Sequence, residues 1–68
     1  MVDTNALKAE IVRNGYNGAD CAKSIGVCPD TFYRKLKNGT FTLREAFNLA
    51  KLLKMKEPAK IFFAEKLS

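Results

Sequence analysis

Side chains suited to contact an anion lie close together in the middle of the chain. Tyr33, Arg34, Lys35 and Lys37 follow one another there. An arginine guanidinium can donate two parallel hydrogen bonds to a phosphate or to the edge of a guanine, and a lysine ammonium supplies a compact positive charge. Asp30 precedes Arg34 by four residues, so the two side chains share one face of a helix. A carboxylate placed there can hold the guanidinium flat for a two-point contact.

The charge of the whole chain favours the same kind of partner. Twelve lysines and arginines stand against seven acidic residues, which gives a net charge of +5 on 68 residues. Such an excess favours polyanions, nucleic acid before an anionic membrane, although many basic domains carry only a solvated face. No apolar run approaches the roughly 20 residues that cross a bilayer, and the first residues lack a basic-then-apolar pattern, so we expect no signal peptide. We therefore expect a protein of the bacterial cytoplasm.

The composition lacks the residues that catalytic and metal sites usually require. The chain has no histidine and no Gly-rich phosphate loop, and no credible nucleophile has a base beside it. Its two cysteines, Cys21 and Cys28, are too few for a disulfide framework or a zinc site without histidine. We expect no enzyme activity, no cofactor and no metal, with Cys21 in the core and Cys28 at a helix start.

The pattern of apolar residues predicts helices throughout. No useful stretch alternates with period two, so the expected fold is all-α, a compact bundle of four to five short helices in one domain, residues 1–68. A first helix begins at Asp3 or Thr4 and ends at Asn14-Gly15. The helices that follow are expected at about residues 17–25, 29–37, 43–54 and 58–66.

The second and third expected helices meet at a tight joint. Asn17 caps the second, and Pro29 takes the first position of the third, where its missing N–H costs nothing. Ala22 is small enough for the helices to cross closely. Gly26 can adopt the left-handed conformation that redirects the chain, so the turn is expected at residues 26–28.

The fourth expected helix is the most strongly patterned. Thr42 and Glu45 fit the capping box that opens a helix, and Phe41 before them returns to the interior. The expected apolar side of this helix comprises Leu43, Ala46, Phe47, Ala50 and Leu53.

Two segments resemble the DNA-binding domain of the lambda-repressor-like and Cro-like phage regulators, the XRE family. The first, GYNGADCAKSIGV over residues 15–27, resembles the family pattern Gly-Leu-Thr-Gln-x-x-Leu-Ala-x-x-Leu-Gly-Val. The second, DTFYRKLKNGTFTLREAFNLAKLL over residues 30–53, is similar to the third helix, loop and fourth helix of short phage members. The resemblance implies a helix-turn-helix whose third helix lies in the major groove.

The resemblance also implies which residues meet the bases. The matching positions are Pro29, Asp30, Tyr33, Arg34 and Lys37. Well-known members carry Gln or Ser where this chain has Pro29 and Asp30, so Pro29 offers only an apolar face, suited to a thymine methyl. The hypothesis is that Arg34 is the main base reader. Asp30 then orients it, accepts from a cytosine, or forms only an ordinary surface ion pair.

Phosphate contacts are expected on both sides of the third helix. The start of the second helix offers free N–H groups, and Gly18 leaves room for a phosphate to approach. Tyr33 has two interpretations, a hydroxyl donor to DNA or partial packing against the second helix. The candidate phosphate-binding residues are Asn17, Gly18, Lys23, Lys35, Asn38, Gly39, Thr40 and Thr42.

The end of the chain is more apolar than one helix face requires. Some of its residues must seal the bundle, and the remainder either belong to the core too or form the seam of a homodimer. Relatives bind paired half-sites about 34 Å apart as two-fold dimers. The dimer candidates are Ile61, Phe62, Phe63 and Leu67.

The predicted function is that of a sequence-specific regulator of transcription that binds double-stranded DNA as a dimer, a repressor or Cro-like protein of a phage or mobile element. The alternative is a protein-interaction module on the same scaffold, such as an antitoxin or phage accessory protein. Pro29 and Asp30 favour this alternative, whereas the net charge of +5 opposes it. No small-molecule ligand is evident from the sequence.

Overall fold

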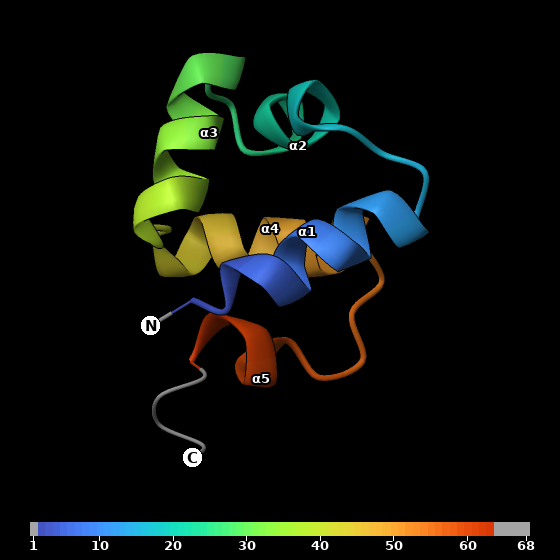
Figure 1. Ribbon diagram of the computed structural model, residues 1–68. Coiled ribbons are helices and arrows are strands. Elements are labelled where there is room, and N and C mark those ends of the chain that lie inside the picture. Colours follow the sequence, from blue (N-terminus) through green and yellow to red (C-terminus); the bar gives the residue numbers. More distant parts are fainter. Residues whose placement is uncertain (1, 64–68) are drawn as a thin grey trace.

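Five helices make up residues 2–63, the part of the chain that the computed structural model describes (Figure 1). They are α1 (Thr4–Arg13), α2 (Gly18–Ser24), α3 (Pro29–Asn38), α4 (Leu43–Leu52) and α5 (Pro58–Phe62). No strand occurs among these residues, so the predicted all-α fold is confirmed. The last helix ends at Phe62, with Phe63 as its C-cap residue, so it is shorter than the expected 58–66, of which residues 64–66 lie outside the described residues. None of the five helices is long and apolar enough to cross a membrane.

The helices enclose one core. In Figure 1, α1 and α4 lie across the middle, α2 and α3 lie above them, and α5 lies below. Phe32 is fully buried, and the ring of Phe41 lies between Phe32 and Phe62, with centroid distances of 5.8 and 6.1 Å. The buried core residues are Leu7, Ile11, Cys21, Ala22, Phe32, Leu36, Ala46, Leu49, Leu53 and Phe62.

Capping side chains mark the starts of helices and left-handed glycines follow their ends, much as the sequence indicates. The Asp3 carboxylate accepts a hydrogen bond from the Ala6 N–H at 3.1 Å and caps α1. Gly15, just after α1, and Gly39, at the end of α3, have left-handed backbones with φ of 75° and 66°. The Asp3 N–H also donates to the Ile61 carbonyl at 2.7 Å, which joins the start of α1 to α5.

The start of α4 is capped and also tied to α3. Thr42 and Glu45 form the predicted capping box: the Thr42 hydroxyl accepts from the Glu45 N–H, and the Glu45 carboxylate accepts from the Thr42 N–H. The same carboxylate pairs with the Lys35 ammonium of α3 at 3.2 Å. Burial opposes the charged carboxylate, but the Thr42 N–H and the Lys35 ammonium together lower the pKa of Glu45 below its ordinary value.

The expected apolar side of α4 is wrong in part. Leu43 is 74% exposed and Phe47 is 63% exposed, whereas Leu49, absent from the expected set, is fully buried. At about 100° per residue, Ala46, Leu49 and Leu53 share one side; Leu43 lies roughly 90° from the centre of that side, and Phe47 lies roughly 130° from it. The buried side of α4 therefore includes Leu49 instead of Leu43 and Phe47, and these two large apolar side chains remain on the surface.

The end of α4 also differs from the expected residue 54. The last helical residue is Leu52, and Lys54 takes a left-handed backbone with φ of 51°. The Met55 N–H then donates to the Ala50 carbonyl at 3.0 Å, which closes the helix end. Glycine normally takes this position, so the sequence contains no visible stop signal here.

We predict that Glu45→Gln lowers the free energy of unfolding by about 1 kcal/mol near neutral pH. The substitution removes the negative charge of the carboxylate that pairs with Lys35 and accepts a hydrogen bond from the Thr42 N–H. The folded-state pKa of Glu45 lies below its ordinary value of 4.5. Its contribution is therefore fully present above that value and lost as the pH falls through the folded pKa. Urea unfolding at a series of falling pH values should show the difference between wild type and variant shrinking once the pH is below 4.5.

Glu57→Gln is the matched control, because the Glu57–Lys60 pair is exposed at both side chains. It should change stability little at any of these pH values. A Glu45→Gln difference that stayed constant from pH 7 to pH 3 would contradict the assignment.

Candidate nucleic-acid interface

The joint between α2 and α3 is built as a short turn. Ile25 ends α2, and Gly26 follows with a left-handed φ of 73°. The Val27 N–H donates back to the Ala22 carbonyl at 3.0 Å, which holds the turn closed. Ala22 is itself almost fully buried, and α2 and α3 pack closely against each other. Cys28 precedes α3 as its N-cap residue.

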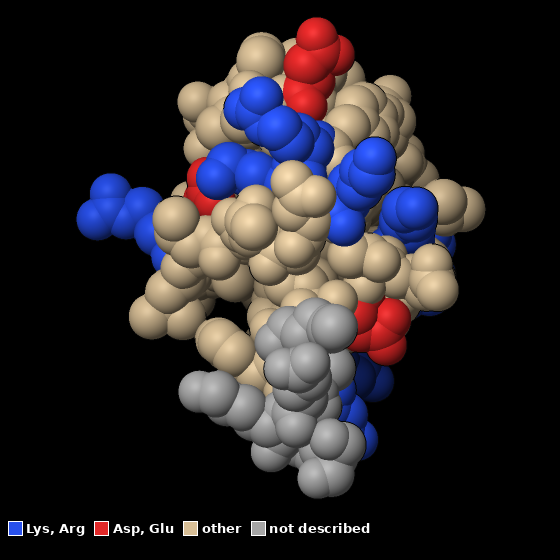
Figure 2. Space-filling view, turned by 60° about the vertical axis from the view of Figure 1, so that its left-hand side comes forward, with Lys and Arg blue, Asp and Glu red and all other residues tan. Residues whose placement is uncertain are grey.

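Helix α3 buries one side and presents the other to solvent. Phe32 and Leu36 point into the core, whereas Tyr33, Arg34 and Lys37 are exposed. Spacings of three and four residues place these exposed side chains, with Asp30 one turn earlier, along one stripe of the helix. Figure 2, turned so that the α3 side comes forward, shows several Lys and Arg side chains close together on this face.

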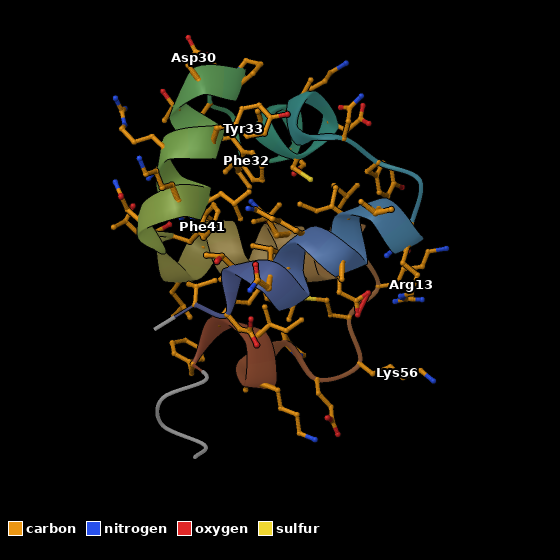
Figure 3. All side chains as sticks on the ribbon, in the orientation of Figure 1. Arg13, Asp30, Phe32, Tyr33, Phe41 and Lys56 are labelled. Atoms are coloured by element: carbon orange, nitrogen blue, oxygen red, sulfur yellow. The ribbon has the colours of Figure 1, made fainter. Side chains whose placement is uncertain are left out.

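Asp30 and Arg34 are not joined as hypothesised. Both are exposed, and the part of the chain that the structure describes contains no ion pair between them. Asp30 instead lies in the first turn of α3, at the outer end of that helix in Figure 3. A carboxylate at this position stabilises the positive end of the helix, so Asp30 has a structural reason to be there without orienting Arg34.

Tyr33 packs across the start of α2. Its side chain points from α3 toward α2 in Figure 3 and is 53% exposed. A Cβ placed on the buried Gly18 would overlap the hydroxyl and ring carbons of Tyr33. Glycine at this position therefore makes room for the tyrosine ring. The expectation that Gly18 leaves space for a phosphate is corrected, and the packing interpretation of Tyr33 fits the structure.

The start of α2 is already occupied by its own side chains. The Asn17 amide oxygen accepts from the Asp20 N–H at 2.9 Å, and the Asp20 carboxylate accepts from the Asn17 N–H at 3.0 Å. This capping box satisfies two of the N–H groups expected to meet a phosphate and places a negative charge beside them. A phosphate is less favoured here than the sequence indicates.

The remaining phosphate candidates divide into two groups. Lys35 is turned inward to the Glu45 carboxylate, and Gly39 is partly covered by Val2. The exposed candidates are Lys23, Asn38, Thr40 and Thr42. Arg44, exposed in the first turn of α4, adds a cation beside the loop that follows α3. The sequence interpretation missed Arg44 because it used that segment only as a helix start.

Of the dimer candidates, Phe62 is buried and Ile61 packs against the core. Phe63 is 39% exposed, and Leu67 lies outside the described residues. Large exposed apolar side chains occur instead on α4 and just after α5. Leu43, Phe47 and Phe63, here called the α4–α5 apolar face, line a shallow hollow of about 190 Å³.

The two cysteines have separate surroundings. Cys21 is fully buried, and burial together with the nearby Asp20 charge raises its pKa to about 11. Cys28 is exposed, and a hydrogen bond with the Thr31 hydroxyl lowers its pKa. No group of three metal-binding side chains gathers within residues 2–63.

No protein-family model matches the chain, and no curated protein or solved structure is detectably similar to it. Support for a function therefore comes from the geometry and charge of its own residues. The exposed side of α3 combines an accessible helix with arginine and lysine side chains that lie close together on one face of the molecule.

We predict that Gly18→Ala moves the Tyr33 ring away from α2 and changes the free energy of unfolding by less than about 1 kcal/mol, because the displaced ring is largely exposed. In a Tyr33→Ala background the same substitution should be stabilising, since alanine favours helix more than glycine does. A double-mutant cycle in urea measures this coupling, expected at about 0.5–1 kcal/mol. Additive effects would show that Tyr33 does not rest on Gly18.

Proposed function

We propose that the protein is a sequence-specific DNA-binding regulator in which α2 and α3 form a helix-turn-helix. The observation that carries this proposal is the exposed stripe of α3, with Arg34 and Lys37 on an accessible helix anchored by Phe32 and Leu36. A helix presented in this way can enter the major groove, and guanidinium groups are the commonest readers of guanine there. The net charge of +5 favours the same polyanion.

The contacts divide into base readers and phosphate contacts. Arg34 reads bases as the main donor, with Lys37 and Tyr33 beside it and the exposed ring of Pro29 available to a thymine methyl. The exposed loop and flanking residues contact phosphates on either side of the groove and set the register. These flanking residues are Lys23, Asn38, Thr40, Thr42 and Arg44.

We predict that Arg34→Ala weakens binding to a selected duplex by about 1–3 kcal/mol while changing binding to random duplex much less. Lys37→Ala should reduce the slope of log affinity against log salt by about one. The duplex is first selected from a random pool, and fluorescence anisotropy then measures affinity at several salt concentrations.

Arg13→Ala is the matched control, because Arg13 is an exposed arginine at the far end of α1 from α3 (Figure 3). It should leave the selected-to-random affinity ratio unchanged. Equal losses on all sequences for Arg34→Ala would exclude base reading, and absence of binding at any salt would exclude the DNA proposal.

The α4–α5 apolar face supports the second part of the proposal, a homodimer on paired half-sites. Each exposed Phe or Leu here can bury on the order of 100 Å², so the three together cover a few hundred Å² per copy. A stable standard interface needs about 800 Å² per partner. We therefore expect a weak dimer that forms on DNA, where the second copy is held at high local concentration.

We predict that Phe47→Lys abolishes this association and leaves the free energy of unfolding within about 0.5 kcal/mol of wild type, since the ring is mostly solvated already. Val12→Lys is the matched control, because Val12 is 76% exposed on α1 and lies outside the face. Sedimentation at high concentration, and cooperativity on a duplex with two half-sites, measure the effect. Equal behaviour of the two variants would exclude this face as the seam.

Such a regulator acts in the bacterial cytoplasm on chromosomal or phage DNA, as a repressor or Cro-like protein of a phage or mobile element does. The second candidate function is a protein-interaction module, and the same exposed apolar face favours it. In that case a partner protein covers the face and no specific duplex emerges from selection.

A further inference from the structure

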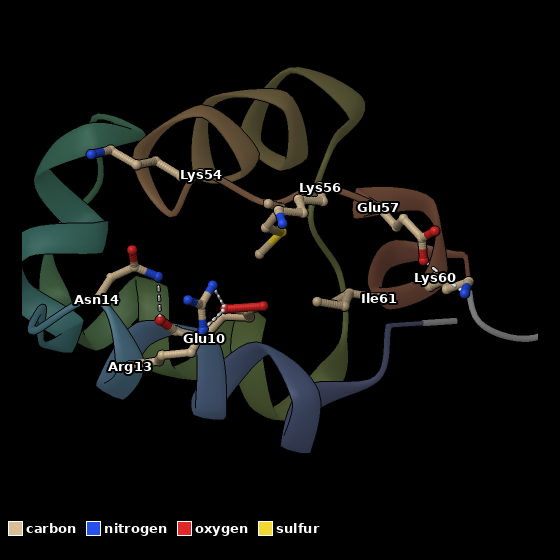
Figure 4. A pocket seen from close by; sticks show the side chains of 9 residues that line it. Glu10, Arg13, Asn14, Lys54, Lys56, Glu57, Lys60 and Ile61 are labelled. Carbon is tan, nitrogen blue, oxygen red and sulfur yellow. Dashed lines mark hydrogen bonds and ion pairs between the residues drawn. The ribbon is translucent and has the colours of Figure 1, made fainter.

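We propose that the hollow between α1, the α4–α5 loop and α5 binds a small organic anion. This hollow, here called the α1–α5 hollow, has a volume of about 590 Å³, within the range of small-molecule sites (Figure 4). The cationic side chains that line it are Arg13, Lys54, Lys56 and Lys60. Met55 and Ile61 contribute apolar surface.

The charges around the hollow do not cancel. Arg13 donates from Nε to the Glu10 carboxylate at 2.8 Å, and the Lys60 ammonium pairs with Glu57 at 2.7 Å. Lys54 and Lys56 have no ion pair with any carboxylate among residues 2–63. Two positive charges thus remain uncompensated among the residues that line the hollow, and each can pair with a carboxylate or phosphate.

The backbone of Lys54 gives an independent reason to assign its side chain a role. Its left-handed φ of 51° suits glycine or asparagine, and a lysine costs free energy in that conformation. A cation after a helix end does interact favourably with the carbonyls of α4, but any nearby residue could supply that charge. The unfavourable backbone position of Lys54 beside the hollow is consistent with a role for its side chain in the proposed binding.

The rest of the hollow suits the apolar part of a ligand and is held in place. Met55 and Ile61 are half-buried and pack against the core. The Asn14 amide donates to the Glu10 carbonyl at 2.8 Å and to the Leu53 carbonyl at 3.0 Å, so the ends of α1 and α4 are tied together at the rim. An anion with an aliphatic or aromatic portion fits this combination better than a bare ion does.

The hollow is separate from the proposed DNA surface. In Figure 3 the side chains of Arg13 and Lys56 lie on the opposite side of the molecule from Asp30 and the outer end of α3. A duplex bound along α3 would therefore leave the hollow open. The site does not depend on the proposed function, and a failure of DNA binding leaves it standing.

The test is an NMR titration of the isotope-labelled chain with phenyl phosphate, in the absence of DNA. Phenol is the neutral control, and inorganic phosphate is the control without an apolar part. The amide signals of Asn14 and of residues 54–57 should shift and saturate with phenyl phosphate, at roughly tenfold lower concentration than with either control. Shifts that rise without saturation, or that are largest along α3, overturn the proposal.

Variants give the proposal a second, independent test. Lys54→Gly with Lys56→Gln should weaken phenyl phosphate binding about tenfold, whereas Lys8→Gln with Lys51→Gln, which removes the same charge from exposed sites outside the hollow, should not. Lys54→Gly alone should raise the unfolding midpoint and still weaken binding, so lost folding cannot explain the result.

Unchanged binding in the Lys54→Gly, Lys56→Gln variant overturns the proposal. So does a loss of DNA affinity in that variant as large as the loss in Arg34→Ala, because the two lysines would then be DNA contacts. Retained DNA affinity with weakened phenyl phosphate binding supports the site.

Discussion

The burial of Phe32 is the constraint on which the surface of α3 depends. Its ring is fully buried, lies 5.8 Å from the Phe41 ring, and through Phe41 is linked to Phe62 of α5. One turn later Leu36 is buried too, so the rotation of α3 about its own axis is fixed. Because residues 34 and 36 differ by about 200°, Arg34 must then face solvent. The candidate DNA surface is thus a consequence of how the core is filled.

Local chemistry is why much of this fold could be predicted. The caps at Asn17 and Thr42, Pro29 at the start of α3, and the glycines at positions 15, 26 and 39 each act within a few residues of the chain. Such signals do not depend on distant packing. The helices and the joint between α2 and α3 therefore agree with the sequence prediction to within two residues, apart from the last helix, which ends at Phe62 instead of near residue 66.

The features that could not be predicted depend on which helices meet. Leu49 is buried and Phe47 exposed because α2 and α5 approach α4 from particular sides, and both choices suit an amphipathic helix equally well. Lys35 leaves the candidate DNA surface because Glu45, ten residues later, receives it. Tyr33 rests over Gly18 for the same kind of reason. Side-chain type indicated which residues of α3 are exposed, but only packing decides which cations remain on that side.

Three places break a local rule, and each lies on a different surface. Gly18 weakens the first turn of α2 under Tyr33, Phe47 leaves a ring in water on α4, and Lys54 holds a left-handed backbone beside the α1–α5 hollow. Each costs up to about 1 kcal/mol, which matters in a chain whose small core leaves a stability of only several kcal/mol. The Tyr33 ring that packs over Gly18 accounts for that glycine, whereas folding alone does not account for Phe47 or Lys54. Conflicts between local preference and fold concentrate where a surface is used, and the surfaces at Phe47 and Lys54 are those assigned to a second copy and to an anion.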